Sequence, residues 1–374
     1  MALATAEGLA DEFDTIFLGP PGPALVEAER LGFQTRQFLT CRDLAYVLMP
    51  LLEQYPSLTF VGTGPRYNLV CIALNMLYSR RIKHIQIVHG GTGTHKEAFR
   101  NLQKDYSRKK MLNFFDITFV AVSDWSKRQL IDFGVRNRIE VVGNFISPAK
   151  LDAIPKRPPY TRVGVRNVII VSRVDHVKRV DLLLSALDRR QREMCDISFR
   201  ILGSGPEFAN LSGRARCAHP NVEFVGFSDD VAAEMARADL LLHLCPVEPF
   251  GLVVLEAMAA NLAVMVPDRG GAASLVRNGV SGLIFRADDA DDLAGRLVDL
   301  KYAPPELLNR MVFNADRGVH SEFSAESSLR RYRELFAPAQ KLGWNSVSHH
   351  LRPPQQPVVW HRTDGAGNRS GIVH

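Results

Sequence analysis

The sequence contains few cysteines and no run of apolar residues long enough to cross a membrane. The five cysteines are odd in number and show no CxxC spacing, which excludes a regular disulfide framework and favours reduced thiols. No apolar run approaches the ~20 residues that span a bilayer, and the opening residues MALATAEGLADEFD lack the basic and apolar regions of a signal peptide. We therefore expect a soluble cytoplasmic protein that is at most peripheral to a membrane.

The sequence also lacks a recognisable metal-binding cluster. Its histidines at 84, 176, 219 and 243 show no metal-ligand spacing with the cysteines, so we interpret them as structural. An acidic run, RADDADDL at residues 286–293, contains a DxD-like cluster, but it precedes a helical pattern, which favours helix capping over metal binding. We expect neither a metal ion nor another cofactor.

Basic residues outnumber acidic ones, 46 to 40, which gives a net charge of +6 and favours anionic partners. Lys96, Arg100, Lys104 and Arg108 recur every four residues and so share one face of a predicted helix. This basic stripe is either a solvated face or a surface for anionic lipid or a phosphate-linked acceptor. Nothing resembles a nucleic-acid-reading helix or an aromatic stacking platform, so we expect no nucleic acid.

The remaining pattern is an alternation of strands and helices. From residue 167, short β-branched runs such as NVIIVSRV and LAVMVP alternate with amphipathic stretches such as VDLLLSALDRRQ, and the first half repeats this less regularly. Such alternation predicts βαβ units and parallel sheets with both faces covered. We predict an α/β fold with two doubly wound, Rossmann-like domains that face each other across a cleft.

Composition suggests the domain boundaries. The stretch SPAKLDAIPKRPPYTRVGVR is rich in Pro and basic residues and is typical of a linker. We therefore place the first domain at residues 1–160 and the second at 161–322. Residues 341–374 lose periodicity, which predicts a disordered or loosely attached tail, and docking of Trp344 and Trp360 is the alternative.

Two glutamates, Glu248 and Glu256, stand out in the stretch CPVEPFGLVVLEAM. Pro249 suits the first turn of a helix, so the amides of residues 250–252 would lie at a helix end that binds anions. An anionic ligand lying across this end could offer hydroxyl groups to both glutamates. Alternatively, Glu248 caps the helix and Glu256 makes a salt bridge.

Two further motifs follow predicted strands. Arg173 and Lys178 lie five residues apart in VSRVDHVKRVD and could bind a diphosphate, or they could be solvated basic residues at a helix start. Gly203 and Gly205 in ILGSGPE permit a sharp turn or close approach to a ligand. They form an incomplete dinucleotide fingerprint because Phe208 replaces its third glycine.

Five motifs together resemble, in order and spacing, the retaining nucleotide-sugar glycosyltransferases of family 4, which have the GT-B fold. These motifs are SRVDHVK, LGSGPE, VEFVGF, EPFGLVVLEAMAAN and GGAASLVRNGVSGLIF, and they cover most of residues 165–330. FSAESSLRRYRELF is similar to the closing helix of that family, so we expect residues 323–340 to pack back on the first domain. The first half matches through HGG, VAVSDWSKRQL and VVGNFIS.

The resemblance implies a role for each motif. Glu248 would hold the donor sugar near its anomeric carbon, and His89 would face the sugar from the first domain. Glu256 would hold the ribose, and Arg173 with Lys178 the diphosphate. The implied donor-binding residues are Arg173, Lys178, Gly203, Gly205, Phe250, Gly251, Leu252 and Glu256, and those on the acceptor side are Gly90, Gly91 and His95.

The resemblance further implies transfer of a hexose or related sugar from a nucleotide-sugar to a saccharide or lipid-linked acceptor, with retention of configuration. Arg173, Lys178 and the helix end could stabilise the departing diphosphate without a metal. Such an enzyme would serve polysaccharide or envelope assembly.

One departure from the family affects this expectation. Family members begin with a strand, a glycine-rich loop and a helix, whereas this sequence starts within what resembles that helix. We therefore expect an N-terminally truncated first domain. The alternative function is a non-catalytic nucleotide-binding homologue that acts as a partner subunit.

Overall fold

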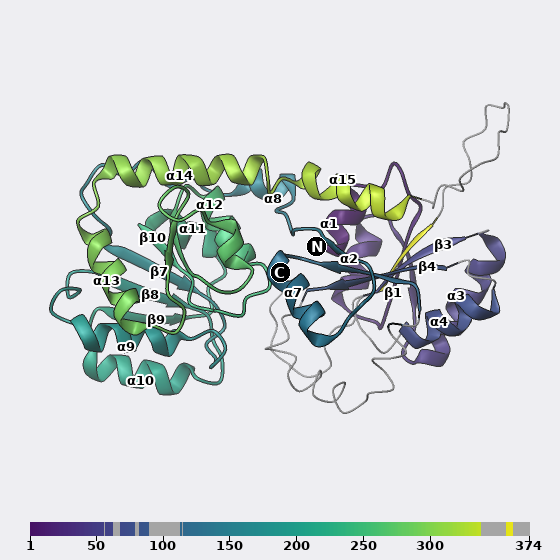
Figure 1. Ribbon diagram of the computed structural model, residues 1–374, viewed down its shortest axis with the longest axis horizontal. Coiled ribbons are helices and arrows are strands. Elements are labelled where there is room, and N and C mark those ends of the chain that lie inside the picture. Colours follow the sequence, from purple (N-terminus) through teal and green to yellow (C-terminus); the bar gives the residue numbers. More distant parts are fainter. Residues whose placement is uncertain are drawn as a thin grey trace.

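The computed structural model describes residues 1–55, 57–62, 68–78, 82–89, 113, 115–337 and 357–361 (Figure 1). Gly90, Gly91, His95 and the basic stripe that starts at Lys96 lie outside these residues. The predicted α/β class is confirmed, because the chain forms two parallel sheets, each flanked by helices (Figure 1). These are the two predicted Rossmann-like domains.

The first sheet has seven strands in the described part of the chain, in the order β2-β1-β13-β3-β4-β5-β6. The strands are β1 (Thr15–Gly19), β2 (Gln34–Gln37), β3 (Leu58–Gly62), β4 (Ile82–Val88), β5 (Ile117–Ala121), β6 (Ile139–Val141) and β13 (Val358–His361). The helices of this half are α1 (Ala2–Glu7), α2 (Pro23–Arg30), α3 (Cys41–Gln54), α4 (Asn68–Leu77), α7 (Asp124–Phe133) and α8 (Pro148–Ala153).

The second sheet has six described strands in the order β12-β11-β10-β7-β8-β9. The strands are β7 (Asn167–Val171), β8 (Ser198–Leu202), β9 (Val222–Gly226), β10 (Leu240–Leu242), β11 (Ala263–Pro267) and β12 (Leu283–Phe285). The helices are α9 (Val180–Arg190), α10 (Phe208–Ala218), α11 (Val231–Arg237), α12 (Leu252–Ala259), α13 (Ala290–Lys301), α14 (Pro305–His320) and α15 (Ala325–Phe336), with a short 3-10 turn η1 (Ala272–Leu275). Apolar runs such as AVMVP in β11 are buried along their whole length, as expected for a strand covered on both faces.

Strand β13 differs from the expected disordered tail. Its four residues lie in the middle of the first sheet, parallel to β1 on one side and β3 on the other. Trp360 is 2% exposed and packs against Phe17 and Phe336. Three apolar residues followed by a histidine are too few to show a periodicity, which is why composition alone suggested disorder. For these residues the docked alternative is correct, and the rest of residues 341–374 lies outside the described chain.

Helix α15 joins the end of the second domain to the first. Helix α14 lies along the second domain, and α15 continues from it onto the first domain (Figure 1). Leu329, Tyr332 and Phe336 share a core with Leu9 of the first domain. An ion pair between Arg333 and Glu12 (2.6 Å) adds a polar contact at the same surface.

The segment predicted to be an irregular linker is partly helical, and the rest of it is held by side-chain contacts. Its first part forms α8, and Tyr160 is buried, with its hydroxyl donating to the carbonyl oxygen of Asp239 at 2.8 Å. The Asp239 carboxylate accepts from Arg157 and Arg162, each at 2.7 Å. These contacts fix the segment between the domains to the amino end of β10, an interior strand of the second sheet.

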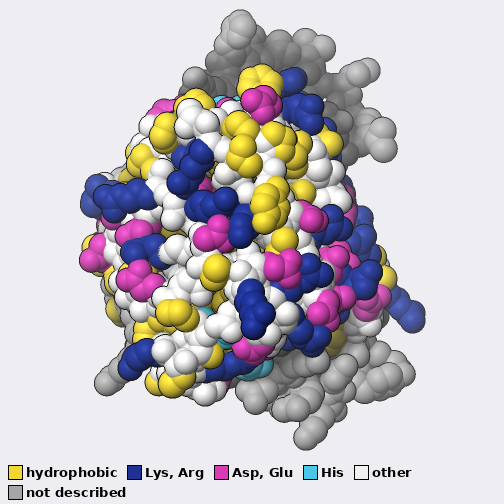
Figure 2. Space-filling view, turned by 90° about the vertical axis from the view of Figure 1, so that its left-hand side faces the viewer, with side chains coloured by type: hydrophobic (Ala, Val, Ile, Leu, Met, Phe, Trp, Pro, Cys, Tyr) yellow, Lys and Arg dark blue, Asp and Glu magenta, His cyan; other side chains and the backbone are white. Residues whose placement is uncertain are grey.

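The outer face of the second domain carries mixed charge. Basic and acidic side chains are interspersed over it (Figure 2), and residues of its outer helices pair across elements, as Arg189 does with Asp291 at 2.6 Å. The face in this view therefore presents no extended basic surface.

Candidate active site

Most of the predicted site residues of the second domain lie in loops that follow parallel strands, whereas Leu252 and Glu256 lie on helix α12. Arg173 and Lys178 follow β7, Gly203 and Gly205 follow β8, and Glu248 follows β10. These loops therefore emerge at the carboxyl edge of the second sheet. Ligands of doubly wound domains bind at this edge.

Lys178 and Glu248, 70 residues apart in sequence, form an ion pair of 2.6 Å between Nζ and Oε2. The pair is only partly accessible, with side-chain exposures of 26% and 18%. Burial opposes both charges, but each charge stabilises the other, so that the pKa of Lys178 is raised and the pKa of Glu248 is lowered. The site therefore holds a fixed cation and a fixed anion that can accept hydrogen bonds from hydroxyl groups.

His243, for which the sequence predicts only a structural role, also belongs to the electrostatic environment of this pair. It is buried, and burial lowers its pKa to about 4, so the ring is neutral at pH 7. It interacts electrostatically with both Glu248 and Lys178. Its position directly after β10 is the one signal that could have placed it near the site.

Arg173 is held by Asp175, a residue that the sequence analysis missed. The Arg173 Nε donates to Asp175 Oδ2 at 2.5 Å. The other carboxylate oxygen accepts from the amides of Val177 and Lys178 at 2.9 and 3.0 Å. Asp175 thus shapes the loop that presents both basic residues. An Asp in a loop can form an Asx turn, in which its side chain accepts from the amide two residues later, and this is the signal that could have identified Asp175.

The glycines after β8 allow two loops to touch. Gly203 has φ +127°, and a Cβ there would lie 2.0 Å from the carbonyl oxygen of Ser172. A Cβ on Gly205 would lie 2.3 Å from the carbonyl oxygen of Val174. These glycines therefore pack against the backbone on either side of Arg173, which explains their identity without a direct ligand contact.

The loop that carries Glu248 corrects one expectation about the helix start. Helix α12 begins at Leu252, so Pro249 precedes the helix rather than forming its first turn. The cause is Gly251, which takes the left-handed φ of +101° as the N-cap residue. The amide of Phe250 hydrogen-bonds to Glu248, so this predicted ligand amide is already engaged by the site's own carboxylate.

The first domain contacts this loop directly through residues that the sequence analysis did not single out. Ser123, at the end of β5, donates its hydroxyl to the carbonyl oxygen of Pro249 at 2.6 Å. The Phe250 side chain is buried in a core that includes Val122 and Ile146 of the first domain. The loop that carries Glu248 is thus held by the first domain at Pro249 and Phe250.

Glu256 does not join the Lys178–Glu248 pair. Its carboxylate accepts from Lys150 of α8 at 2.6 Å, and its side chain is 21% exposed. This is the salt bridge that the sequence analysis kept as the alternative. Its predicted contact with a ribose stays a prediction.

His89 follows β4 at the carboxyl edge of the first sheet and is exposed. Within the described residues, no group of three or more His, Cys, Asp or Glu side chains is arranged to hold a metal ion. In the DxD-like run, Asp289 is the N-cap residue of α13, and its side chain accepts from the amides of Asp291 and Asp292. The capping interpretation of that run is therefore confirmed.

None of the helices that the structure describes is long and apolar enough to cross a membrane. The five cysteines, all in the described chain, form no disulfide.

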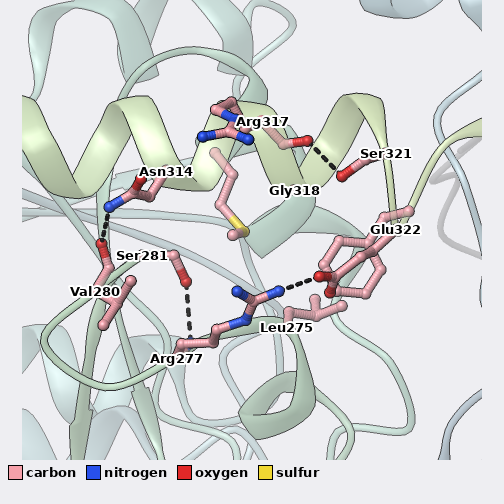
Figure 3. Close-up of a pocket in the computed structure, with 11 residues that line it drawn as sticks. Leu275, Arg277, Val280, Ser281, Asn314, Arg317, Gly318, Ser321 and Glu322 are labelled. Carbon is pink, nitrogen blue, oxygen red and sulfur yellow. Dashed lines mark hydrogen bonds and ion pairs between the residues drawn. The ribbon is translucent and has the colours of Figure 1, made fainter.

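A hollow of about 300 Å³ lies away from these residues, between α14 and the segment after η1 (Figure 3). Two of its polar side chains are already engaged by the protein: Arg277 pairs with Glu322, and Asn314 donates to the backbone carbonyl oxygen of Val280 at 3.1 Å. None of the predicted site residues lines it. The hollow therefore does not coincide with the candidate site.

Comparison with known proteins matches the second domain to one family. Residues 157–317 match the family model described as "Glycosyl transferases group 1". An N-acetyl-alpha-D-glucosaminyl L-malate synthase of Bacillus anthracis is 29% identical over 204 residues, 53% of each chain. A phosphatidyl-myo-inositol mannosyltransferase of Mycolicibacterium smegmatis is 31% identical over 48% of this chain and 47% of that protein. The matches span about half the length of these relatives.

Solved structures resemble the whole described fold. HepE of Anabaena, in complex with UDP and glucose, superposes with a TM-score of 0.68 at 19% identity, covering 89% of this chain and 94% of that one. A glycosyltransferase from Rickettsia africae gives a TM-score of 0.66 at 16% identity, covering 89% and 92%. The predicted GT-B fold is confirmed.

Proposed function

We propose that this chain is a glycosyltransferase that moves a sugar from a nucleotide-sugar to a saccharide or lipid-linked acceptor, with retention of configuration. The observation that carries the proposal is the half-buried Lys178–Glu248 pair. It lies at the carboxyl edge of a doubly wound sheet, within the region that matches the glycosyltransferase family model.

In this proposal the second domain binds the donor. Lys178 and Arg173 offset the negative charge that builds on the departing diphosphate, as preorganised cations do without a metal ion. Glu248, ionised because its pKa is lowered, accepts hydrogen bonds from the hydroxyl groups of the donor sugar. Glu256 exchanges Lys150 for the ribose hydroxyls, and His89 faces the sugar from the first domain.

UDP is the first nucleotide to test as the leaving group, because HepE, the structural relative, binds UDP and glucose. We propose polysaccharide or envelope assembly on the cytoplasmic face of a membrane as the setting. The mannosyltransferase relative carries phosphatidyl-myo-inositol in its name, which supports a lipid-linked acceptor as one candidate.

Glu248→Gln tests the proposal directly. We expect the variant to bind UDP at least as tightly as the wild type, measured by calorimetry, because the amide removes the anion that pairs with Lys178 but leaves the two cations assigned to the diphosphate. We expect kcat for sugar transfer to fall at least about 100-fold, since a charge that acts on the reacting sugar is lost.

Glu326→Gln, at an exposed position on α15, is the matched control and should transfer at the wild-type rate. Full transfer by Glu248→Gln would remove Glu248 from the mechanism. A wild-type chain that binds UDP but transfers no sugar to any acceptor tried would favour the alternative function, a non-catalytic partner subunit.

A further inference from the structure

The two sheets have the same arrangement of strands in space, but the order of those strands along the chain differs. In the second sheet the central strand, β7, comes first; β8 and β9 follow to one side, and β10 to β12 to the other. This is the doubly wound order 3-2-1-4-5-6. In the first sheet β1 and β2 lie to one side and β3 to β6 to the other, but the central place belongs to β13, the last described strand.

We infer that the first domain is a circularly permuted doubly wound domain, in which residues 357–361 supply the central strand and are required for a competent active site. The central position is made by backbone hydrogen bonds on both sides. The amide of Val358 donates to the carbonyl oxygen of Asp14 at 2.8 Å. The carbonyl oxygen of Pro357 accepts from the amide of Thr59 at 3.0 Å.

The side chains of β13 complete the core on each face of the sheet. Val359 is fully buried with Ile16 and Phe60 in one cluster. Trp360 is buried with Phe17 and Phe336 in the cluster on the opposite face. A central strand that is apolar on both faces is typical of a parallel sheet covered by helices.

Strand β13 also joins β1 and β2 to the strands that lead to the site. His361 lies level with Leu18 of β1 and Gly62 of β3 at the carboxyl edge. Beyond β3 lie β4, which leads to His89, and β5, which leads to Ser123 and its hydrogen bond to Pro249. Loss of β13 would separate β1 and β2 from these strands and displace the first domain's half of the site.

Hydrogen exchange on the unmodified full chain tests the position of the strand. We expect the amides of residues 358–361 to exchange within about tenfold of those of β3, because both strands open only when the sheet unfolds. Strand β2, at the sheet edge, is the internal reference for faster exchange. Exchange of residues 358–361 at the rate of an unstructured peptide would overturn the inference.

Val359→Asp tests the requirement for activity. We expect transfer to fall at least about 100-fold, the scale of a lost catalytic contact, while UDP affinity stays near wild type because Lys178 and Arg173 belong to the second sheet. Val26→Asp, on the exposed face of α2, is the control for the same charge in the same domain. Wild-type transfer by Val359→Asp would overturn the requirement.

A rearranged full chain keeps the inference testable if Val359→Asp does not fold. In this variant residues 343–374 precede Met1, joined to it through a short Gly-Ser linker, so that the central strand comes first. We expect the melting temperature and UDP affinity of the wild type. A rearranged chain whose first domain is unfolded would contradict the inference. The exchange and melting measurements do not depend on sugar transfer. A failure of this inference can therefore be told apart from a failure of the proposed function on which its activity test rests.

Discussion

Three buried histidines make the stability of this protein sensitive to mild acid. Burial lowers the pKa of His84, His243 and His361 to about 4 each. The unfolded chain therefore binds more protons than the folded chain once the pH falls below about 6.5. The free energy of unfolding consequently decreases from about pH 6.5 down to about pH 4 and loses nothing further from these groups below that.

His84→Leu should reduce this sensitivity. His84 lies on β4 against the ring of Phe60, at a centroid distance of 5.6 Å, where an apolar side chain of similar volume fits. We expect the drop in unfolding free energy between pH 7.5 and pH 5.5, measured by urea denaturation, to shrink by about 1 kcal/mol. Phe313→Leu, at an exposed position on α14, is the control: it changes no titratable group, and its drop should equal that of the wild type. An unchanged drop in His84→Leu would contradict the argument.

Single residues also show what sequence could and could not predict about the site. Glu248 and Lys178 were predictable because each lies in a loop after a strand, beside a motif of recognisable spacing. Ser123 and Lys150 were not, because their partners, Pro249 and Glu256, are more than 100 positions away in sequence. Pairings of that range are set by the docking of two domains, which leaves no local pattern.

At the scale of elements, the loop between β10 and α12 depends on Gly271, whose backbone packs against it. A Cβ on Gly271 would lie 1.9 Å from the carbonyl oxygen of Pro249 and 2.8 Å from the Ser123 hydroxyl. The amide of Gly271 donates to the carbonyl oxygen of Glu248 at 2.6 Å. The loop can approach so closely only because this position has no side chain.

Gly271→Ala should therefore displace the loop and the Glu248 carboxylate with it. We expect kcat for transfer to fall by about 10- to 100-fold, the cost of moving a catalytic group by about 1 Å. Gly213→Ala on α10 is the matched control: no atom lies within 4 Å of its new Cβ. It should leave kcat unchanged and stabilise the fold by about 0.5–1 kcal/mol, measured by thermal denaturation. Normal transfer by Gly271→Ala would show that the loop adapts.

The elements themselves were predictable to different degrees. The second half was regular enough to predict because its strands and helices alternate with clear apolar periodicity. Strand β13 was not, since a run of three apolar residues among prolines and polar residues is indistinguishable from a loop. The start of α12 was displaced from Pro249 by the left-handed Gly251, a backbone choice that the sequence permits but does not require.

At the scale of the whole molecule, the two domains are joined around the candidate site. Ser123 of the first domain binds the Glu248 loop, Lys150 binds Glu256 of α12, and α15 returns to pack on the first domain. The core around Phe250 is continuous from one domain to the other. The position of Glu248 relative to the first domain is therefore set by contacts that neither domain makes alone.

Ser123 allows this coupling to be tested apart from stability. Its hydroxyl accepts from the amide of Ser126 at the start of α7 and donates to Pro249. Ser123→Gly leaves a residue type that is tolerated at the N-cap but cannot donate, whereas Ser123→Thr keeps both functions. We expect Ser123→Gly to melt within a few degrees of the wild type, about the effect of 1 kcal/mol.

The two variants should nevertheless differ in catalysis, because only Ser123→Thr keeps the 2.6 Å bond from residue 123 to the Pro249 carbonyl oxygen. We expect Ser123→Gly to lower kcat about 10-fold, since this hydrogen bond between the domains is lost and the longer bond from the Ser126 hydroxyl, at 3.3 Å, is left to hold that carbonyl. UDP affinity should hardly change, because the groups proposed to bind the diphosphate lie on the second domain. Ser123→Thr should transfer at the wild-type rate. Equal kcat values for the two variants would mean that the first domain does not position the Glu248 loop through Ser123.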